Sequence, residues 1–281
     1  MRPAVTRSRF GHPIRTSASR CRKHAHRRRV YSLSQRHLLF ASGRRSRTSS
    51  DGDPYRCGRF APMIDELMVA DRIRSIRERI DRRGRPGVRL VAVTKGFGVD
   101  AVVAAVRGGC ADIGENYAQE LVTKMTELPS TASQPVVHFI GRLQSNKVRM
   151  IAPIVDLWHT VDRPGLIEEI GRRAPVARIL LQVNLTGEPD KGGCRPEELE
   201  DLLGLARSRQ LDPVGLMTVG PTDGDPVATR RAFARCANLA NDLGLAELSM
   251  GMSGDLDIAL EEGATIVRVG SAIFGDRPPA R

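Results

Sequence analysis

Short apolar runs alternate with amphipathic segments along most of this chain. Residues 65–82 carry charges on one face and apolar side chains at helical spacing on the other, at Leu67, Ala70, Ile73, Ile76 and Ile80. Apolar runs with the length of strands begin near residue 88 and recur up to residue 269, and helical segments separate them. Such regular alternation predicts a parallel sheet covered by helices.

The pattern contains eight strands, predicted over residues 88–94, 112–114, 136–140, 157–161, 177–184, 214–219, 247–250 and 265–269. The helices are predicted over residues 65–82, 99–107, 118–128, 144–151, 164–173, 196–209, 229–243 and 256–262. Eight such units favour one closed (β/α)8 TIM barrel, and an open doubly wound sheet is the alternative. In a barrel the functional residues follow the carboxyl ends of the strands.

The positive charge lies at the amino-terminal end. The chain has a net charge of +12, but residues 1–50 hold 14 Lys or Arg and no acid, and the remaining 231 residues are nearly neutral. This composition predicts a disordered Arg- and Ser-rich leader over residues 1–62 and a single domain over residues 63–281. The leader resembles a transit peptide, but a start codon assigned too early, with Met63 or Met68 as the natural beginning, explains it too.

Two further classes of protein are disfavoured by composition. A nucleic-acid-binding arm is a third interpretation of the leader, but the basic residues lack interleaved aromatic side chains. No apolar run reaches 18 residues, so no membrane span is expected, and the five scattered cysteines match neither a disulfide framework nor a zinc site.

The expected location is the cytoplasm, or an organelle if the leader is a transit peptide, and a monomer is expected.

Lys95 ends the apolar run of residues 90–95, at the place where a barrel keeps its chemistry. An amine desolvated by Val91 and Val93 has the nucleophilicity to form a Schiff base with an aldehyde, although a solvated cap is the alternative interpretation. The following residues, Gly96-Phe97-Gly98, predict a loose loop beside this lysine.

Two later strand ends are suited to phosphate. Residues 249–255 and 269–272 supply serines and glycines at strand-to-helix turns, where unpaired backbone N–H groups favour an anion. Arg268 lies within an apolar strand and needs a partner, which is either a core carboxylate or the ring nitrogen of a cofactor. We expect the His159 side chain either to pack against a planar ring or to donate a hydrogen bond to a backbone carbonyl oxygen.

Seven motifs in order resemble the pyridoxal phosphate homeostasis proteins, the YggS/PROSC family. They lie at residues 92–95, 114–120, 138–147, 184–193, 215–217, 248–253 and 267–275. The resemblance implies a barrel similar to the N-terminal domain of alanine racemase, holding pyridoxal 5′-phosphate (PLP). It makes Lys95 the Schiff-base lysine and aims Arg268 at the pyridine nitrogen. It assigns the phosphate to Ser249, Ser253, Gly270 and Ser271, and the rest of the pocket to Asn116, His159 and Met217.

The function that the resemblance implies is that of a carrier. It binds PLP, maintains vitamin B6 homeostasis and supplies PLP-dependent apoenzymes, with no catalytic residue assigned. The alternative is a PLP-dependent racemase or decarboxylase. Racemases of this type need a second acid or base from an added domain, and the chain ends eleven residues after Gly270, before such a domain.

Overall fold

The computed structural model describes residues 64–83 and 87–277. Its strands are β1 (Arg89–Val93), β2 (Asp112–Glu115), β3 (Val136–Phe139), β4 (Leu157–Val161), β5 (Arg178–Gln182), β6 (Asp212–Met217), β7 (Glu247–Ser249) and β8 (Ile266–Val269). All eight pair in parallel and in sequence order, and β8 returns to β1 to close the barrel. The predicted (β/α)8 barrel is therefore confirmed, and the open sheet is wrong.

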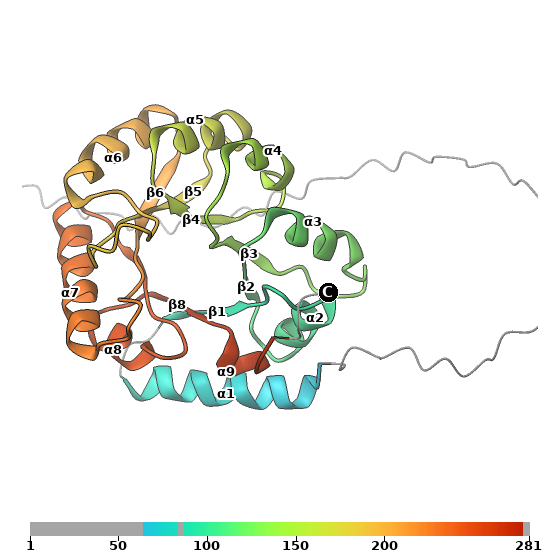
Figure 1. Cartoon of the computed structure of the whole chain (residues 1–281). Helices are drawn as coiled ribbons and strands as arrows, with labels where there is room; N and C mark the ends of the chain where they lie inside the picture. Colours follow the sequence, from blue (N-terminus) through green and yellow to red (C-terminus); the bar gives the residue numbers. More distant parts are fainter. Residues whose placement is uncertain (1–63, 84–86, 278–281) are drawn as a thin grey trace, which may run out of the picture. The chain divides into compact units, whose positions relative to one another are not determined.

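Helices surround the strands, as Figure 1 shows. They are α1 (Glu66–Arg82), α2 (Val99–Arg107), α3 (Ala118–Glu127), α4 (Val148–Ile151), α5 (Pro164–Arg173), α6 (Leu199–Ser208), α7 (Pro226–Asp242), α8 (Leu256–Glu261) and α9 (Ser271–Phe274). Short 3-10 turns, η1 (Ser145–Lys147) and η2 (Pro196–Glu198), precede α4 and α6. The helix predicted over residues 144–151 is thus broken into a turn and a single helical turn.

Helix α7 begins three residues before its predicted start. The Asp225 carboxylate accepts hydrogen bonds from the backbone N–H groups of Val227 and Ala228, and Pro226 occupies the first helical position. Proline fits there because its missing N–H has no intrahelical partner, and an aspartate cap satisfies the free donors. Local capping therefore overrides the apolar periodicity, which becomes clear only from Thr229 onward.

The core has two layers. The larger one lies between strands and helices and includes Val69, Ile73, Ile76 and Ile80 of α1. The smaller one fills the barrel interior with Val91, Leu157, Leu180, Met217 and Ile266. Side chains two residues apart on a strand share a face. His159 and Arg268, two residues after Leu157 and Ile266, therefore also point inward, which gives the barrel a polar layer nearer its carboxyl end.

The predicted leader over residues 1–62 lies outside the described residues. Within residues 64–83 and 87–277, no helix has the length and apolar character required to cross a membrane. Cys110, Cys194 and Cys236 are buried free thiols. Burial raises the pKa of each of these thiols, to between about 11 and about 12.

Candidate functional site

A cavity of about 630 Å³ lies at the carboxyl ends of the strands. Seven of the nine predicted site residues line it, namely Lys95, Asn116, Met217, Ser253, Arg268, Gly270 and Ser271. The other two, Ser249 and His159, are fully buried and do not belong to the lining. Phe97, Asp276 and Arg277 also line the cavity, although the sequence analysis did not select them.

Lys95 lies two residues beyond the end of β1 and is half-buried. Burial is the main cause that lowers its pKa, and the positive charges of Arg277 and Arg268 lower it further, against the opposing effect of Glu115 and Glu120. A lowered pKa raises the fraction of free amine at neutral pH. A larger fraction of free amine is what nucleophilic attack on a carbonyl group requires.

Three charged residues hold the loop on both sides of Lys95. The Lys124 ammonium donates to the Thr94 carbonyl oxygen at 2.7 Å, and the Glu120 carboxylate accepts the backbone N–H of Gly96 at 2.6 Å. Lys124 also pairs with Glu120 and with Glu115, at 2.6 Å each. We call Glu115, Glu120 and Lys124 the Lys95 clamp. The loop that its glycines predicted to be loose is thus tied at the residues before and after the lysine.

The clamp is buried where it meets the barrel. The Lys124 side chain is 3% exposed and that of Glu115 is fully buried. One Glu115 oxygen also accepts the Thr94 hydroxyl at 2.5 Å. Desolvation raises the pKa of Glu115, and Lys124 is the main opposing influence. Sequence reasoning did not select Lys124, although its spacing of three residues from Leu121 places it on the buried face of α3.

Arg268 has neither a carboxylate nor a ring among its partners. Its guanidinium donates to the Ser249 hydroxyl at 2.5 Å and to the Thr218 carbonyl oxygen at 3.0 Å. Burial lowers its pKa to about 10, so it still carries its charge at neutral pH. Of the two alternatives for Arg268, the core carboxylate is therefore wrong for the described residues, and the ring nitrogen of a cofactor stays a prediction.

Ser249 and His159 belong to a chain of hydrogen bonds through the barrel interior. We call it the buried chain. From Arg268 it passes to Ser249, then to His159 Nδ1 at 2.9 Å. His159 Nε2 lies 2.8 Å from His138 Nδ1, and His138 Nε2 lies 3.0 Å from the Asp112 carboxylate. His159 thus satisfies side chains rather than a backbone carbonyl, and its packing against a planar ring stays a prediction.

The two ends of the buried chain set the direction of its hydrogen bonds for a neutral His138 ring. The Asp112 carboxylate only accepts, so such a ring carries its proton on Nε2 and its Nδ1 accepts from His159 Nε2. His159 Nδ1 then accepts the Ser249 hydroxyl hydrogen, and the Ser249 oxygen accepts from Arg268. Burial, reinforced by His138 and Arg268, holds the pKa of His159 well below its usual value, which keeps this ring neutral. The Ser249 hydroxyl hydrogen is therefore donated to His159, and no hydrogen of this hydroxyl remains for a ligand in the cavity.

The turns after β7 and β8 meet at another part of the cavity wall. The Ser271 hydroxyl lies 3.2 Å from that of Ser253, and Ser253 Oγ accepts the backbone N–H of Ala272 at 3.4 Å. Gly251 has φ of +94°, and a Cβ there would meet the Ala259 side chain at 2.5 Å. This crowding requires glycine at the start of the first turn. The structure thus brings together the two turns that the sequence singled out.

Fold and site together define an eight-stranded α/β barrel with a lysine-bearing ligand pocket at its carboxyl end. Residues 64–278 match the family described as alanine racemase, N-terminal domain. The chain is 40% identical over 211 residues to the pyridoxal phosphate homeostasis protein of Vibrio cholerae, covering 71% of this chain and 89% of that one. The protein of the same name from Pseudomonas aeruginosa is 42% identical, with coverage of 72% and 91%.

Solved structures of similar proteins agree with the family found by sequence comparison. PipY of Synechococcus elongatus, with PLP bound, is 35% identical with a TM-score of 0.67, covering 74% of this chain and all of that one. Alanine racemase from Streptomyces coelicolor shares the fold at 22% identity and a TM-score of 0.62, covering 76% and 60% of the two chains. The chain belongs to the pyridoxal phosphate homeostasis protein family, whose barrel is of the alanine racemase N-terminal type.

Proposed function

We propose that this chain binds PLP on Lys95 and acts as a carrier of the cofactor in vitamin B6 homeostasis. The observation that carries the proposal is the placement of a half-buried amine of lowered pKa in the same cavity as the Arg268 cation. When bound, PLP supplies an aldehyde that forms a Schiff base with an amine. The names of the relatives and the PLP-bound PipY support this assignment.

The described residues fit the cofactor. A volume of about 630 Å³ lies in the range of pockets that enclose small ligands. Asn116 Oδ1 is buried, has no hydrogen-bond partner among the described residues, and belongs to a residue of the cavity wall. Such an atom is costly unless a bound group donates to it. Ser253, Gly270 and Ser271 supply hydroxyl and backbone groups suited to a phosphate.

Arg268 restrains catalysis. Its charge is retained because its pKa of about 10 lies well above neutrality, and it only donates hydrogen bonds. A pyridine nitrogen that faces this guanidinium stays unprotonated, which makes the ring a weaker electron sink. The buried chain holds Arg268 in place through Ser249 and leaves Ser249 no hydrogen for the phosphate, so Ser249 acts in the proposal by positioning the arginine.

The proposal assigns no catalytic residue and differs from a racemase or decarboxylase in its products. A chirality assay with several amino acids, and a carbon dioxide assay, should show turnover no faster than with free PLP. The acceptors in the proposal are PLP-dependent apoenzymes, and the carrier works as a cytoplasmic monomer. The first point is tested by mixing the PLP-loaded chain directly with an apoenzyme and following the recovery of the apoenzyme's activity. The second is tested by light scattering of the purified chain, which gives its mass in solution.

The direct test is the absorption spectrum from 300 to 500 nm. A band in the Schiff-base region should appear on loading with PLP, shift on borohydride reduction, and be absent in Lys95→Ala. Arg149→Ala is the control, because this exposed cation of α4 does not line the Lys95 cavity and its loss should leave the band unchanged. If PLP-loaded Lys95→Ala keeps the same absorption band as the unaltered protein, the proposal is contradicted.

A further inference from the structure

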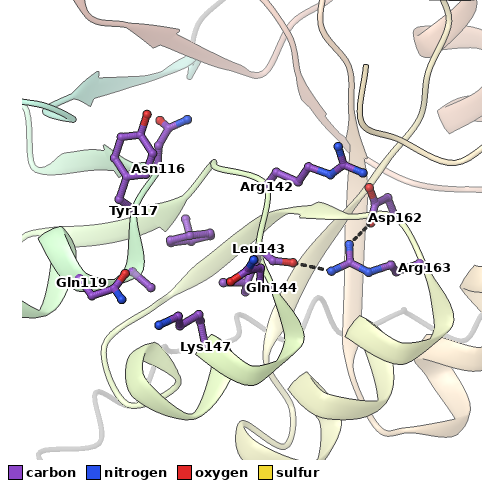
Figure 2. Close-up of a pocket in the computed structure, with 11 residues that line it drawn as sticks. Asn116, Tyr117, Gln119, Arg142, Leu143, Gln144, Lys147, Asp162 and Arg163 are labelled. Atoms are coloured by element: carbon purple, nitrogen blue, oxygen red, sulfur yellow. Dashed lines mark hydrogen bonds and ion pairs between the residues drawn. The ribbon is translucent and has the colours of Figure 1, made fainter. Parts of the chain in front are cut away.

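A second cavity, of about 780 Å³, lies next to the Lys95 cavity. Figure 2 shows its wall, which is built from the segments that follow β2, β3 and β4. Asn116 lines both cavities, so the two share part of their wall. We call this second cavity the basic cleft. Its lining was not used by the proposed function, except for Asn116.

The basic cleft holds uncompensated positive charge. Its lining includes Arg142, Lys147, Arg163 and a single carboxylate, Asp162. Asp162 pairs with Arg163 at 2.6 Å and also accepts the backbone N–H of Gly193 at 3.3 Å. Figure 2 shows Arg163 tied to Asp162 and to the Leu143 carbonyl oxygen. Within residues 64–83 and 87–277, the Arg142 and Lys147 side chains have no ion pair or hydrogen bond, and two cations remain for a ligand.

The other lining side chains indicate what kind of anion fits. Phe139 and Leu143 give the cleft an apolar wall, and Gln119 and Gln144 add amide groups. Tyr117, directly after Asn116, is 57% exposed although it is aromatic. Cations beside aromatic and apolar surface suit a planar ring that carries a phosphate, because the guanidinium and ammonium pair with the phosphate while the ring covers apolar surface. An extended acidic peptide needs no apolar wall.

We propose that the basic cleft is a second, non-covalent binding site for a phosphorylated pyridine, the chemical class of PLP itself. The inference rests on the proposed function, since it makes the cleft the place that cofactor occupies on its way to or from Lys95. Asn116, with its unpartnered Oδ1, forms the shared wall. Arg142 and Lys147 bind the phosphate, and Tyr117 covers the ring.

The test blocks the first site and titrates the second. PLP is fixed on Lys95 by borohydride, and the blocked protein is titrated with pyridoxine 5′-phosphate, which has no aldehyde, by isothermal calorimetry. One molecule should bind per chain. Arg142→Ala and Lys147→Ala should each weaken this binding at least tenfold. Arg149→Ala, which removes an exposed arginine of α4 outside the cleft lining, should leave it unchanged.

Each remaining outcome has a definite meaning. Absence of binding to the blocked protein overturns the inference, and so does inorganic phosphate binding as tightly as pyridoxine 5′-phosphate, because the ring would then contribute nothing. Binding of hexaglutamate without pyridoxine 5′-phosphate overturns it in favour of an acidic protein partner. If borohydride fails to label Lys95, the proposed function fails instead. The cleft is then titrated in Lys95→Ala, where sensitivity to Arg142→Ala still supports it and insensitivity overturns it.

Discussion

Replacing Lys124 by methionine should expose how strongly the Lys95 clamp depends on one buried cation. Lys124 is 3% exposed and donates to Glu115, Glu120 and the Thr94 carbonyl oxygen. In Lys124→Met the fully buried Glu115 keeps only the Thr94 hydroxyl. Removing one partner of a buried ion pair costs about 3–5 kcal/mol, because the other charge stays buried without compensation. We expect a loss of that size in the free energy of unfolding at pH 8.

The loss should depend on pH in a defined direction. Burial already raises the pKa of Glu115, and without Lys124 its main opposing influence is gone. A carboxyl group with a raised pKa in the folded state binds its proton more tightly there than in the unfolded chain. Its destabilising effect is therefore absent below the ordinary value of 4.5 and develops as the pH rises through the folded-state pKa. The deficit of Lys124→Met should be smaller at pH 5.5 than at pH 8.

The assay is urea unfolding of the PLP-free protein, followed by circular dichroism at both pH values. The double variant Glu115→Gln/Lys124→Met removes both charges and should recover most of the stability. Lys147→Met serves as the control and should change the free energy of unfolding by less than about 0.5 kcal/mol. Equal deficits at pH 5.5 and pH 8, or a double variant as unstable as Lys124→Met, would refute the reasoning.

Three further predictions concern the barrel interior and the cavity wall. The neutral His159 should cost the folded state up to about 1.4 kcal/mol per pH unit below pH 6.5, as the unfolded chain takes up its proton; His159→Gln should flatten this slope in urea unfolding, and an unchanged slope contradicts it. Long-range proton–nitrogen spectra should show both histidines of the buried chain protonated on Nε2, and Asp112→Asn should mix the tautomers; mixed forms in the wild type would contradict the assigned direction. Gly141→Ala should destabilise the protein and weaken PLP binding, because the new Cβ would lie 2.0 Å from the Asn116 carbonyl oxygen; Gly165→Ala, with open space around it, is the control, and equal melting temperatures for the two variants would count against the argument.

The barrel could be predicted because each of its units is encoded locally. Apolar runs of strand length and helical stripes such as that of α1 appear directly in the sequence. The errors fall where short-range bonding replaces periodicity. The Asp225 cap extends α7 toward its amino-terminal end, and a 3-10 turn divides the segment before α4. Short elements such as α9 leave too few residues for a periodic signal.

The site was predictable as a set of strand ends but not as a network. Residues after different strands converge at one end of any barrel, so seven of the nine selected residues share a cavity. Which polar groups touch depends on strand register and helix placement. The bond between His159 and Ser249 joins β4 to β7 across 90 residues, and the clamp joins α3 to β2 and to the residue after β1. No spacing along the chain encodes such contacts.

Borohydride reduction of the PLP-loaded chain, followed by peptide mapping, tests the central claim most directly. The chain has only five lysines, at positions 23, 95, 124, 147 and 191, so the label can be assigned without ambiguity. We predict one pyridoxyl group on the peptide that contains Lys95. A label on any other lysine, or no reducible band after addition of PLP, would contradict the account.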